Sequence, residues 1–159
     1  MSNATPGIAE DDTQRKILEL KHQILEIQNQ GELGFTNINF CSEIRGLGMY
    51  TPLPDNTIPG DEFYVYYEPV NPYTQVQDGT YRIHLTQDLY ILDTEGTVLF
   101  GKEGLLEFSY ETVSPVLDIH MTNTITLTGA SPGTYVWKAV LHDHLRGTSA
   151  QTTKEFIVE

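Results

Sequence analysis

The alternation of apolar and polar residues after Gly31 is the feature that most limits the fold of this chain. In the segment YRIHLTQDLYI (residues 81–91) the apolar residues share one parity and most polar residues share the other. The segment LDIHMTNTITLT (117–128) repeats the pattern. Successive side chains of a strand point to opposite faces, so each run predicts a strand with one buried and one solvated face. Gln87 and Asn123 break the alternation, which predicts a bulge or bend in each long strand.

Turn-forming segments separate these runs at short intervals. DTEGT and ASPGTY carry the glycine, aspartate and proline typical of tight turns, and TPLPDNTIPGDE is a proline-rich loop. A chain of 159 residues suffices for one domain with its own core. The sequence therefore predicts a mainly β fold, an antiparallel immunoglobulin-like β-sandwich of about 7–8 strands with one N-terminal amphipathic α-helix.

The single helical pattern precedes the strands, between Asp12 and Gln30. Its apolar residues follow a heptad-type spacing of three, four and three, at Ile17, Leu20, Ile24 and Ile27. We expect Asp12 or Thr13 to cap the helix and Gly31 to end it in the left-handed conformation. Two alternatives stay open: the stripe packs on its own domain, or the helix protrudes and dimerises or docks on a partner.

Three segments follow from these patterns. Residues 1–10 are expected to form a disordered tail, in which Ser2-Asn3-Ala4 resembles an expression scar. Residues 11–31 are expected to form the amphipathic helix, and residues 32–159 the β-sandwich domain. If such a scar replaced the natural N-terminus, a signal peptide or lipid anchor could have been removed with it, and the lack of a signal peptide is weak evidence for the cytoplasm.

Charge and motif content argue against several functions. Acids outnumber bases by 22 to 9, the net charge is −13, and the bases are scattered, so neither a nucleic-acid partner nor docking on an anionic membrane is expected. No apolar run approaches the roughly 20 residues of a membrane span. Cys41 is the only cysteine and is expected to be a buried, inert thiol. GxSxG, HExxH, phosphate-binding glycine and paired CxxC motifs are all lacking, so we expect neither an enzyme nor a cofactor.

Two parts of the chain resemble bacterial immunoglobulin-like domains. SPGTYVWKAVLHDHLRGTSAQTTKEFIV is similar to their last hairpin. FCSEIRGLGMYTPLPDNTIPGDEFYVYYEPVN and DGTYRIHLTQDLYILDTEGTVLF resemble uncharacterised exported domains of planctomycete-type bacteria. The resemblance covers about residues 36–159. It implies a β-sandwich in the periplasm or at the cell surface, with the cytoplasm as the alternative, and it supplies no catalytic residues. Between Gly101 and Pro115 the basic run expected of that family is missing.

Four histidines share the outward parity of their strands and are the candidate metal ligands: His84, His120, His142 and His144. A His-x-His pair such as that in LHDHLRG can ligate zinc when another strand supplies a third ligand. The alternatives are a pH-sensitive contact or an accidental surface set. Asp143, on the core parity, is expected to accept hydrogen bonds from turn amides.

A second candidate surface is the tyrosine-rich segment EFYVYY. If Phe63, Val65 and Tyr67 face the core, Tyr64 and Tyr66 lie on the other face. Exposed aromatic side chains can bind a carbohydrate or a protein partner, unless a second layer such as the helix covers them.

These features together predict a non-catalytic, exported interaction module with a protein or carbohydrate partner. Its binding residues would be either Tyr64 and Tyr66 or the helix stripe. The alternatives are a metal-binding protein or metal-dependent enzyme that uses the surface histidines, and a structural domain that forms a homodimer through its N-terminal helix.

Overall fold

The computed structural model describes residues 4–159, with side chains from Asp11 onward, and it is mainly β with an N-terminal helix, as the sequence predicts. Over this range there are ten strands, more than the seven or eight expected. The elements are α1 (Ala4–Gln30), β1 (Gly34–Gly46), β2 (Met49–Pro52), the 3-10 turn η1 (Pro54–Asn56), β3 (Thr57–Ile58), β4 (Glu62–Val70), β5 (Gln75–Gln77), β6 (Thr80–Leu92), β7 (Val98–Thr112), β8 (Met121–Thr126), β9 (Gly133–Asp143) and β10 (Thr148–Val158).

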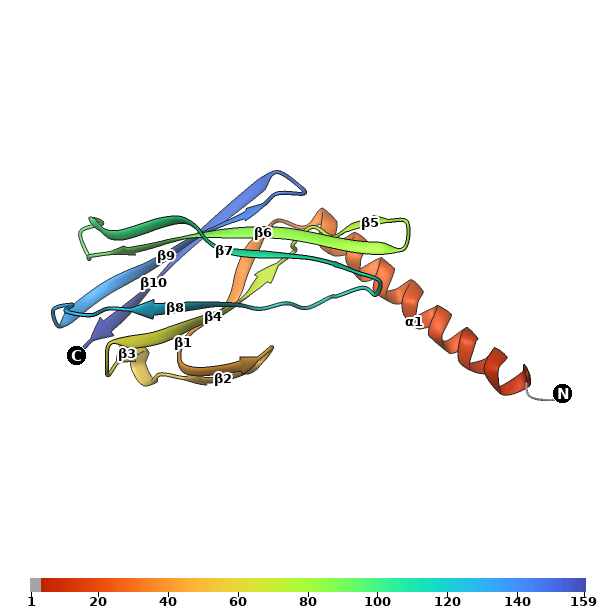
Figure 1. Cartoon of the computed structure of the whole chain (residues 1–159), viewed down its shortest axis with the longest axis horizontal. Helices are drawn as coiled ribbons and strands as arrows, with labels where there is room; N and C mark the ends of the chain where they lie inside the picture. The colour runs from red at the N-terminus through yellow and green to blue at the C-terminus, as the bar shows by residue number, and fades with distance from the viewer. Residues whose placement is uncertain (1–3) are drawn as a thin grey trace.

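The strands form two sheets (Figure 1). A four-stranded sheet has the order β2-β1-β4-β8, and a six-stranded sheet has the order β3-β10-β9-β6-β5, with β7 also paired to β6. The pairing of β3 with β10 is parallel, and the pairings that build the rest of the two sheets are antiparallel. In this order β6 lies between β9 and β7, a position that decides what its outward side chains meet.

The core is built from the apolar parity of both sheets. Trp137 on β9, Phe63 on β4 and Leu85 on β6 are fully buried in one cluster. Burial of each such side chain contributes on the order of 1.5–3 kcal/mol. The alternating pattern therefore places apolar side chains in the core as expected.

Gln87 and Asn123, which break the alternation, do not mark bulges in their own strands. Both side chains are fully buried and pair with each other, through Gln87 Nε2 to Asn123 Oδ1 at 2.7 Å and Asn123 Nδ2 to Gln87 Oε1 at 2.9 Å. Tyr67 donates its hydroxyl to Gln87 at 2.9 Å, and Trp137 donates its indole N–H to Asn123 at 3.1 Å. This polar network ties β6 and β9 of one sheet to β4 and β8 of the other.

The bulge lies instead in β7, opposite Asp88. The register moves from Gln87–Leu106 to Leu89–Lys102, so three residues of β7 face one residue of β6. Gly104, in the middle of them, has a φ of 63°, a left-handed conformation that glycine adopts without strain. The bulge turns the amide of Gly104 toward the Asp88 carboxylate.

The helix is longer than its sequence pattern predicts, because it begins at Ala4 and not at Asp11. Residues 4–10, expected to be a disordered tail, belong to it, and residues 1–3 lie outside the described part of the chain. Asp12, expected as a cap, lies within the helix and pairs with Arg15 and Lys16. Among the described residues, no helix is apolar enough over a sufficient length to cross a membrane.

The helix ends at Gln30 as expected, but Gly31 does not form the expected left-handed cap. Gly31 is not among the residues with positive φ in the described chain. A Cβ atom at this position would lie 2.2 Å from Nδ2 of Asn71. Any larger residue at Gly31 would therefore have to displace the Asn71 side chain, which lies against the turn that leads from the helix into the sheet.

Candidate functional site

Three of the four candidate histidines lie together on the outer face of the six-stranded sheet. His84 is on β6, His142 is on β9, and His144 follows β9 in the turn to β10. The backbone N–H of His144 donates to the carbonyl of His84 at 3.0 Å. The ring centroids of His84 and His144 are 4.6 Å apart, and those of His142 and His144 are 6.3 Å apart. We call these three residues the histidine cluster.

Each imidazole of the histidine cluster has a different partner. Nε2 of His84 lies 2.8 Å from the carboxylate of Glu107, and Nε2 of His142 lies 2.8 Å from the carboxylate of Asp88. Nε2 of His144 lies 2.7 Å from the hydroxyl of Thr86. The cluster therefore holds three titratable bases against two carboxylates, and His144 is the imidazole without one.

Asp88 is held from two sides. Its side chain is 12% exposed, and its second carboxylate oxygen accepts the backbone N–H of Gly104 at 2.8 Å. Burial alone would raise the pKa of Asp88, but the hydrogen bonds from His142 and from Gly104 outweigh it, so the pKa lies below its ordinary value. Asp88 therefore stays a carboxylate at neutral and mildly acidic pH.

The fourth candidate, His120, lies elsewhere. It precedes β8 of the other sheet, and its ring stacks on Tyr66 at a centroid distance of 5.4 Å. Within the described part of the chain, no group of three or more His, Cys, Asp or Glu side chains is arranged to hold a metal ion. The Nε2 atoms of the histidine cluster point to three different partners, so the cluster does not form the convergent ligand set that zinc requires.

The expected tyrosine surface is only partly present. Tyr66 is fully buried, because Tyr50 of β2 lies over it at a centroid distance of 4.3 Å and the Gly48 amide donates to its hydroxyl at 2.7 Å. The hairpin of β1 and β2 thus covers it, and not the N-terminal helix. Tyr64 is partly exposed. The two tyrosines do not form a shared exposed face.

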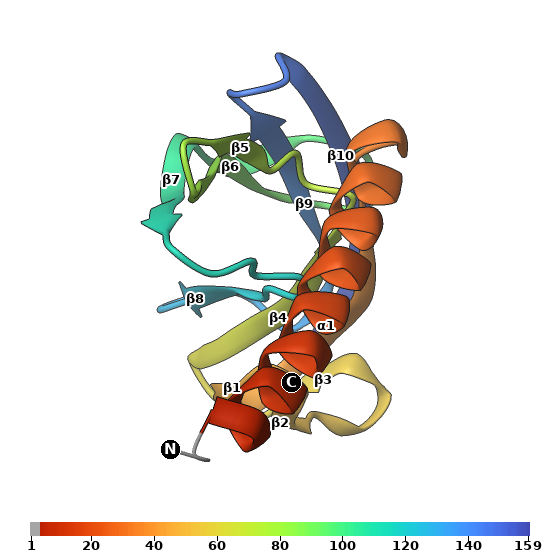
Figure 2. The ribbon, with the colours of Figure 1, turned by 90° about the vertical axis from the view of Figure 1, so that its right-hand side faces the viewer.

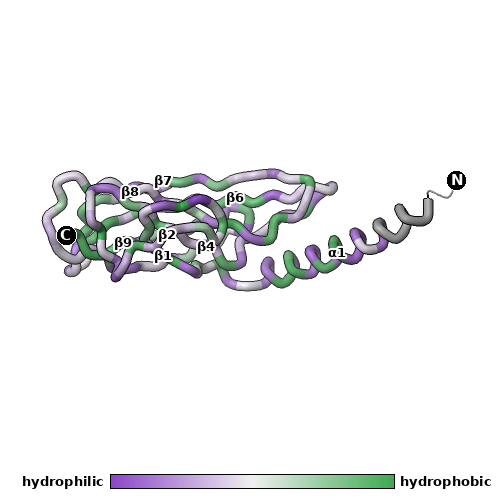
Figure 3. The backbone as a smooth tube through the Cα atoms, turned by 90° about the horizontal axis from the view of Figure 1, so that it is seen from below, coloured by the Kyte–Doolittle hydropathy of each residue, from purple (hydrophilic) through white to green (hydrophobic). Residues whose placement is uncertain are grey.

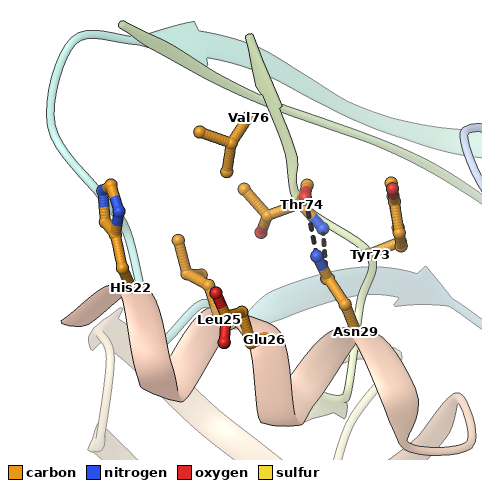
Figure 4. Close-up of a pocket in the computed structure, with 7 residues that line it drawn as sticks. All are labelled: His22, Leu25, Glu26, Asn29, Tyr73, Thr74 and Val76. Carbon is orange, nitrogen blue, oxygen red and sulfur yellow. Dashed lines mark hydrogen bonds between the residues drawn. The ribbon is translucent and has the colours of Figure 1, made fainter. Parts of the chain in front are cut away.

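One face of α1 docks on the segment that leads into β5 (Figure 4). Leu25 is 2% exposed there, and His22 makes a hydrogen bond with the hydroxyl of Tyr81. The side-chain amide of Asn29 pairs with the backbone of Thr74 in both directions, each bond 2.9 Å long. A cavity of about 260 Å³ lies beside these contacts. This seam holds the C-terminal half of the helix.

The predicted apolar stripe of the helix faces solvent. The exposed fractions are 40% for Ile17, 58% for Leu20, 41% for Ile24 and 70% for Ile27. Figure 3 shows apolar residues along α1 where it extends past the sheets. The stripe does not pack on its own domain, which leaves the alternative of a protruding helix.

No protein-family model and no curated protein matches the chain. A solved structure of the Pseudomonas fluorescens alkylpurine DNA glycosylase AlkC, bound to DNA containing an abasic site analog, resembles it with a TM-score of 0.42 and 11% identity. The likeness covers 81% of this chain but only 31% of that one. At this distance it assigns neither an activity nor a ligand to this chain.

Two sequence-based expectations are nonetheless corrected by that finding. The chain was expected to be a non-catalytic exported module and to have no nucleic-acid partner, whereas the structure that resembles it belongs to an enzyme bound to DNA. Neither the exported, non-catalytic assignment nor the exclusion of nucleic acid is carried further.

Proposed function

We propose that residues 32–159 form an immunoglobulin-like β-sandwich and that the histidine cluster on its outer face binds anionic groups when the pH falls. The fold proposal is supported by the shared core of the two sheets and by the resemblance to bacterial immunoglobulin-like domains. The observation that carries the functional proposal is the count of charges, three imidazoles against the carboxylates of Glu107 and Asp88.

The charge of the cluster reverses with protonation. Imidazoles ordinarily take up a proton between about pH 5 and 8. With all three imidazoles neutral, the two carboxylates leave the cluster negative. With all three protonated, His84 and His142 form ion pairs with Glu107 and Asp88, and the imidazolium of His144 is left with no carboxylate of its own. The cluster then carries one positive charge on a protein whose net charge at pH 7 is −13.

Protonation also turns the hydrogen bond between His144 and Thr86. A neutral His144 can accept the Thr86 hydroxyl proton at Nε2, across 2.7 Å. A protonated His144 can only donate there, so the hydroxyl proton of Thr86 turns away from it. The freed hydroxyl of Thr86 can then donate to an oxyanion, such as a phosphate or carboxylate group, beside the positive charge of the imidazolium.

Other charged groups on this face do not cancel the positive charge that the histidine cluster gains on protonation. Arg82 and Glu111 lie opposite each other in the register of β6 and β7, so their charges offset one another. Lys138 on β9 lies over the ring of Tyr90.

The test uses inorganic sulfate as the probe, because sulfate stays a dianion at both pH values, and NMR shifts of the full chain as the readout. We expect sulfate to bind roughly tenfold more tightly at pH 5.5 than at pH 7.5, equivalent to about 1.4 kcal/mol, a size typical of one added charge near a surface. The largest shifts should fall on Thr86 and His144. In His144→Gln the pH dependence should be lost, whereas His120→Gln, on the other sheet, should behave as the unmodified chain. Equal binding at both pH values, or an unaltered His144→Gln, would refute the proposal.

A further inference from the structure

One face of helix α1 is docked on the domain, and the opposite face is exposed to solvent. Successive helical residues are turned by about 100°, so Ile17, Leu20, Ile24 and Ile27 centre on a direction roughly 150° away from the docked side that holds His22, Leu25 and Asn29. The docked face is fixed by the seam with Thr74 and by Gln28, whose side chain donates to the carbonyl of Leu117 at 3.2 Å. Docking therefore orients the apolar stripe away from the domain.

The stripe is not covered by any other part of the described chain. Figure 1 shows α1 running off one end of the two sheets, with its N-terminal end farthest from them, and Figure 2 views the molecule from that end, with α1 in front of the sheets. All four stripe side chains are at least 40% exposed. Single exposed apolar residues are common on protein surfaces, whereas a contiguous row of four branched apolar side chains indicates an interaction surface.

The spacing of the stripe specifies what fits on it. Three, four and three residues separate its members, which places Ile17 and Ile24 at a positions and Leu20 and Ile27 at d positions of a heptad. Side chains in this arrangement insert into holes on a facing helix with the same repeat. The stripe is thus shaped for an amphipathic helix and not for a strand.

The residues that flank the stripe decide between a second copy and another protein. Lys16 is at a g position and Lys21 is at an e position, and glutamine occupies the others, at residues 14, 23, 28 and 30. In a parallel pair of two copies, Lys16 of one helix would meet Lys21 of the other. In an antiparallel pair with the stripes aligned, Lys21 would meet its own counterpart. Like charges at these positions disfavour the pairing, so self-association is opposed in both directions.

We infer that the stripe is the docking site for an amphipathic helix of another protein, one with apolar residues at heptad spacing flanked by Glu or Asp. Such flanks would pair with Lys16 and Lys21 in place of the lysine–lysine contacts of a homodimer. The acids of this part of the helix do not offset the two lysines at the seam, because Asp12, Glu19 and Glu26 lie at c positions and Asp11 lies at a b position. The pairing of Asp12 with Arg15 and Lys16 is exposed and therefore weak, so a partner carboxylate can compete with it.

The experiment uses two synthetic helical peptides with identical leucine and isoleucine seams. One carries glutamate at all flanking positions and the other carries lysine. Binding to the full chain is measured by fluorescence anisotropy at low salt. We expect the glutamate peptide to bind at least tenfold more tightly than the lysine peptide. Lys21→Glu should reduce that preference, because it removes one attractive contact and adds a repulsive one.

Two further variants separate docking from folding. Ile24→Gln changes an exposed side chain, so the helix content by circular dichroism should be unchanged while glutamate-peptide binding is lost. Glu19→Gln, outside the stripe, should bind as the unmodified chain does. Equal affinity for the two peptides, binding that survives Ile24→Gln, or a stable dimer of the chain alone in sedimentation at the concentrations used would overturn the inference.

Discussion

Strand β6 carries two polar clusters that differ in how their hydrogen-bonding groups are matched. Gln87 points inward, and its amide is paired with Asn123 and Tyr67 in the buried network between the sheets. Thr86 and Asp88, its neighbours in sequence, point outward and take part in the histidine cluster. The two clusters are one residue apart along the chain and lie on opposite faces of the same sheet.

The buried network is closed, and the histidine cluster is not. Each polar group of the network has a partner, and burial raises the pKa of Tyr67 well above its ordinary value, so the network keeps one state over the usual range of pH. The histidine cluster has one base more than it has acids, and its net charge depends on the pH of the solvent. A polar cluster of the first kind fixes a register, and one of the second kind can respond to a ligand.

The largest predicted effect is on the buried network. Asn123→Leu removes the acceptor of the Trp137 indole N–H and the 2.7 Å partner of the Gln87 amide nitrogen, which keeps only a 3.5 Å bond to the carbonyl of Asp88. We expect the free energy of unfolding to fall by about 3 kcal/mol, since each buried polar group that loses its partner costs roughly 1–3 kcal/mol. Chemical denaturation measures this change. Thr124→Ala, one position along β8 on its exposed side, is the control and should cost less than about 0.5 kcal/mol. Equal losses in the two variants would show that the network contributes nothing specific.

An intermediate effect is expected at Asp88, and it depends on pH. Because the pKa of Asp88 is lower in the folded than in the unfolded chain, its carboxylate adds stability that is fully present above its unfolded pKa of about 4 and is lost as the pH falls through the folded value. Asp88→Asn should cost about 1 kcal/mol at pH 7 and show a shallower loss of stability below pH 4. Urea midpoints measured between pH 3 and 7 check both. A parallel pH dependence in the two proteins would contradict the assignment.

The smallest predicted effect is on stability at His144. This side chain is exposed and hydrogen-bonded only to the Thr86 hydroxyl among the contacts seen, so His144→Gln should shift the free energy of unfolding by no more than about 0.5 kcal/mol. The same variant should lose the pH dependence of sulfate binding. A large loss of stability in thermal unfolding would show that His144 is needed for the fold, and it would contradict the distinction drawn between the two clusters.

Local pattern predicts the direction of a side chain but not its neighbours. The period of two correctly placed His84 and His142 on a solvated face, and it put Asp143 inside, where it accepts the backbone N–H groups of Tyr73 and Arg146. Which strands lie side by side follows from the whole topology. The sequence therefore could not show that β9 lies beside β6, nor that His120 belongs to the other sheet.

The wrong predictions for Gln87 and Asn123 and for the docked face of the helix share a physical cause. Polar contacts between segments far apart in the sequence leave no signal in the local sequence pattern. Gln87 and Asn123 are 36 positions apart, and each alone reads as a defect in its strand. The docked face of the helix is held largely by His22 and Asn29 through hydrogen bonds, and hydropathy does not count these as packing residues. The heptad spacing of the stripe can be read from the sequence, but whether the stripe is exposed depends on those contacts.

The bulge in β7 has a consequence for the solubility of the protein. Within residues 4–159, β7 pairs with β6 alone. Its other edge, along a strand of fifteen residues, is therefore the kind of template on which a second chain can add a strand and begin to aggregate. Gly104 and its two neighbours interrupt that edge, because the backbone there bends out of register. An incoming strand can match the edge on one side of the bulge or on the other, but not along its whole length. The bend that supplies an amide to Asp88 thereby also protects the longest open edge of the sheet from fibril growth.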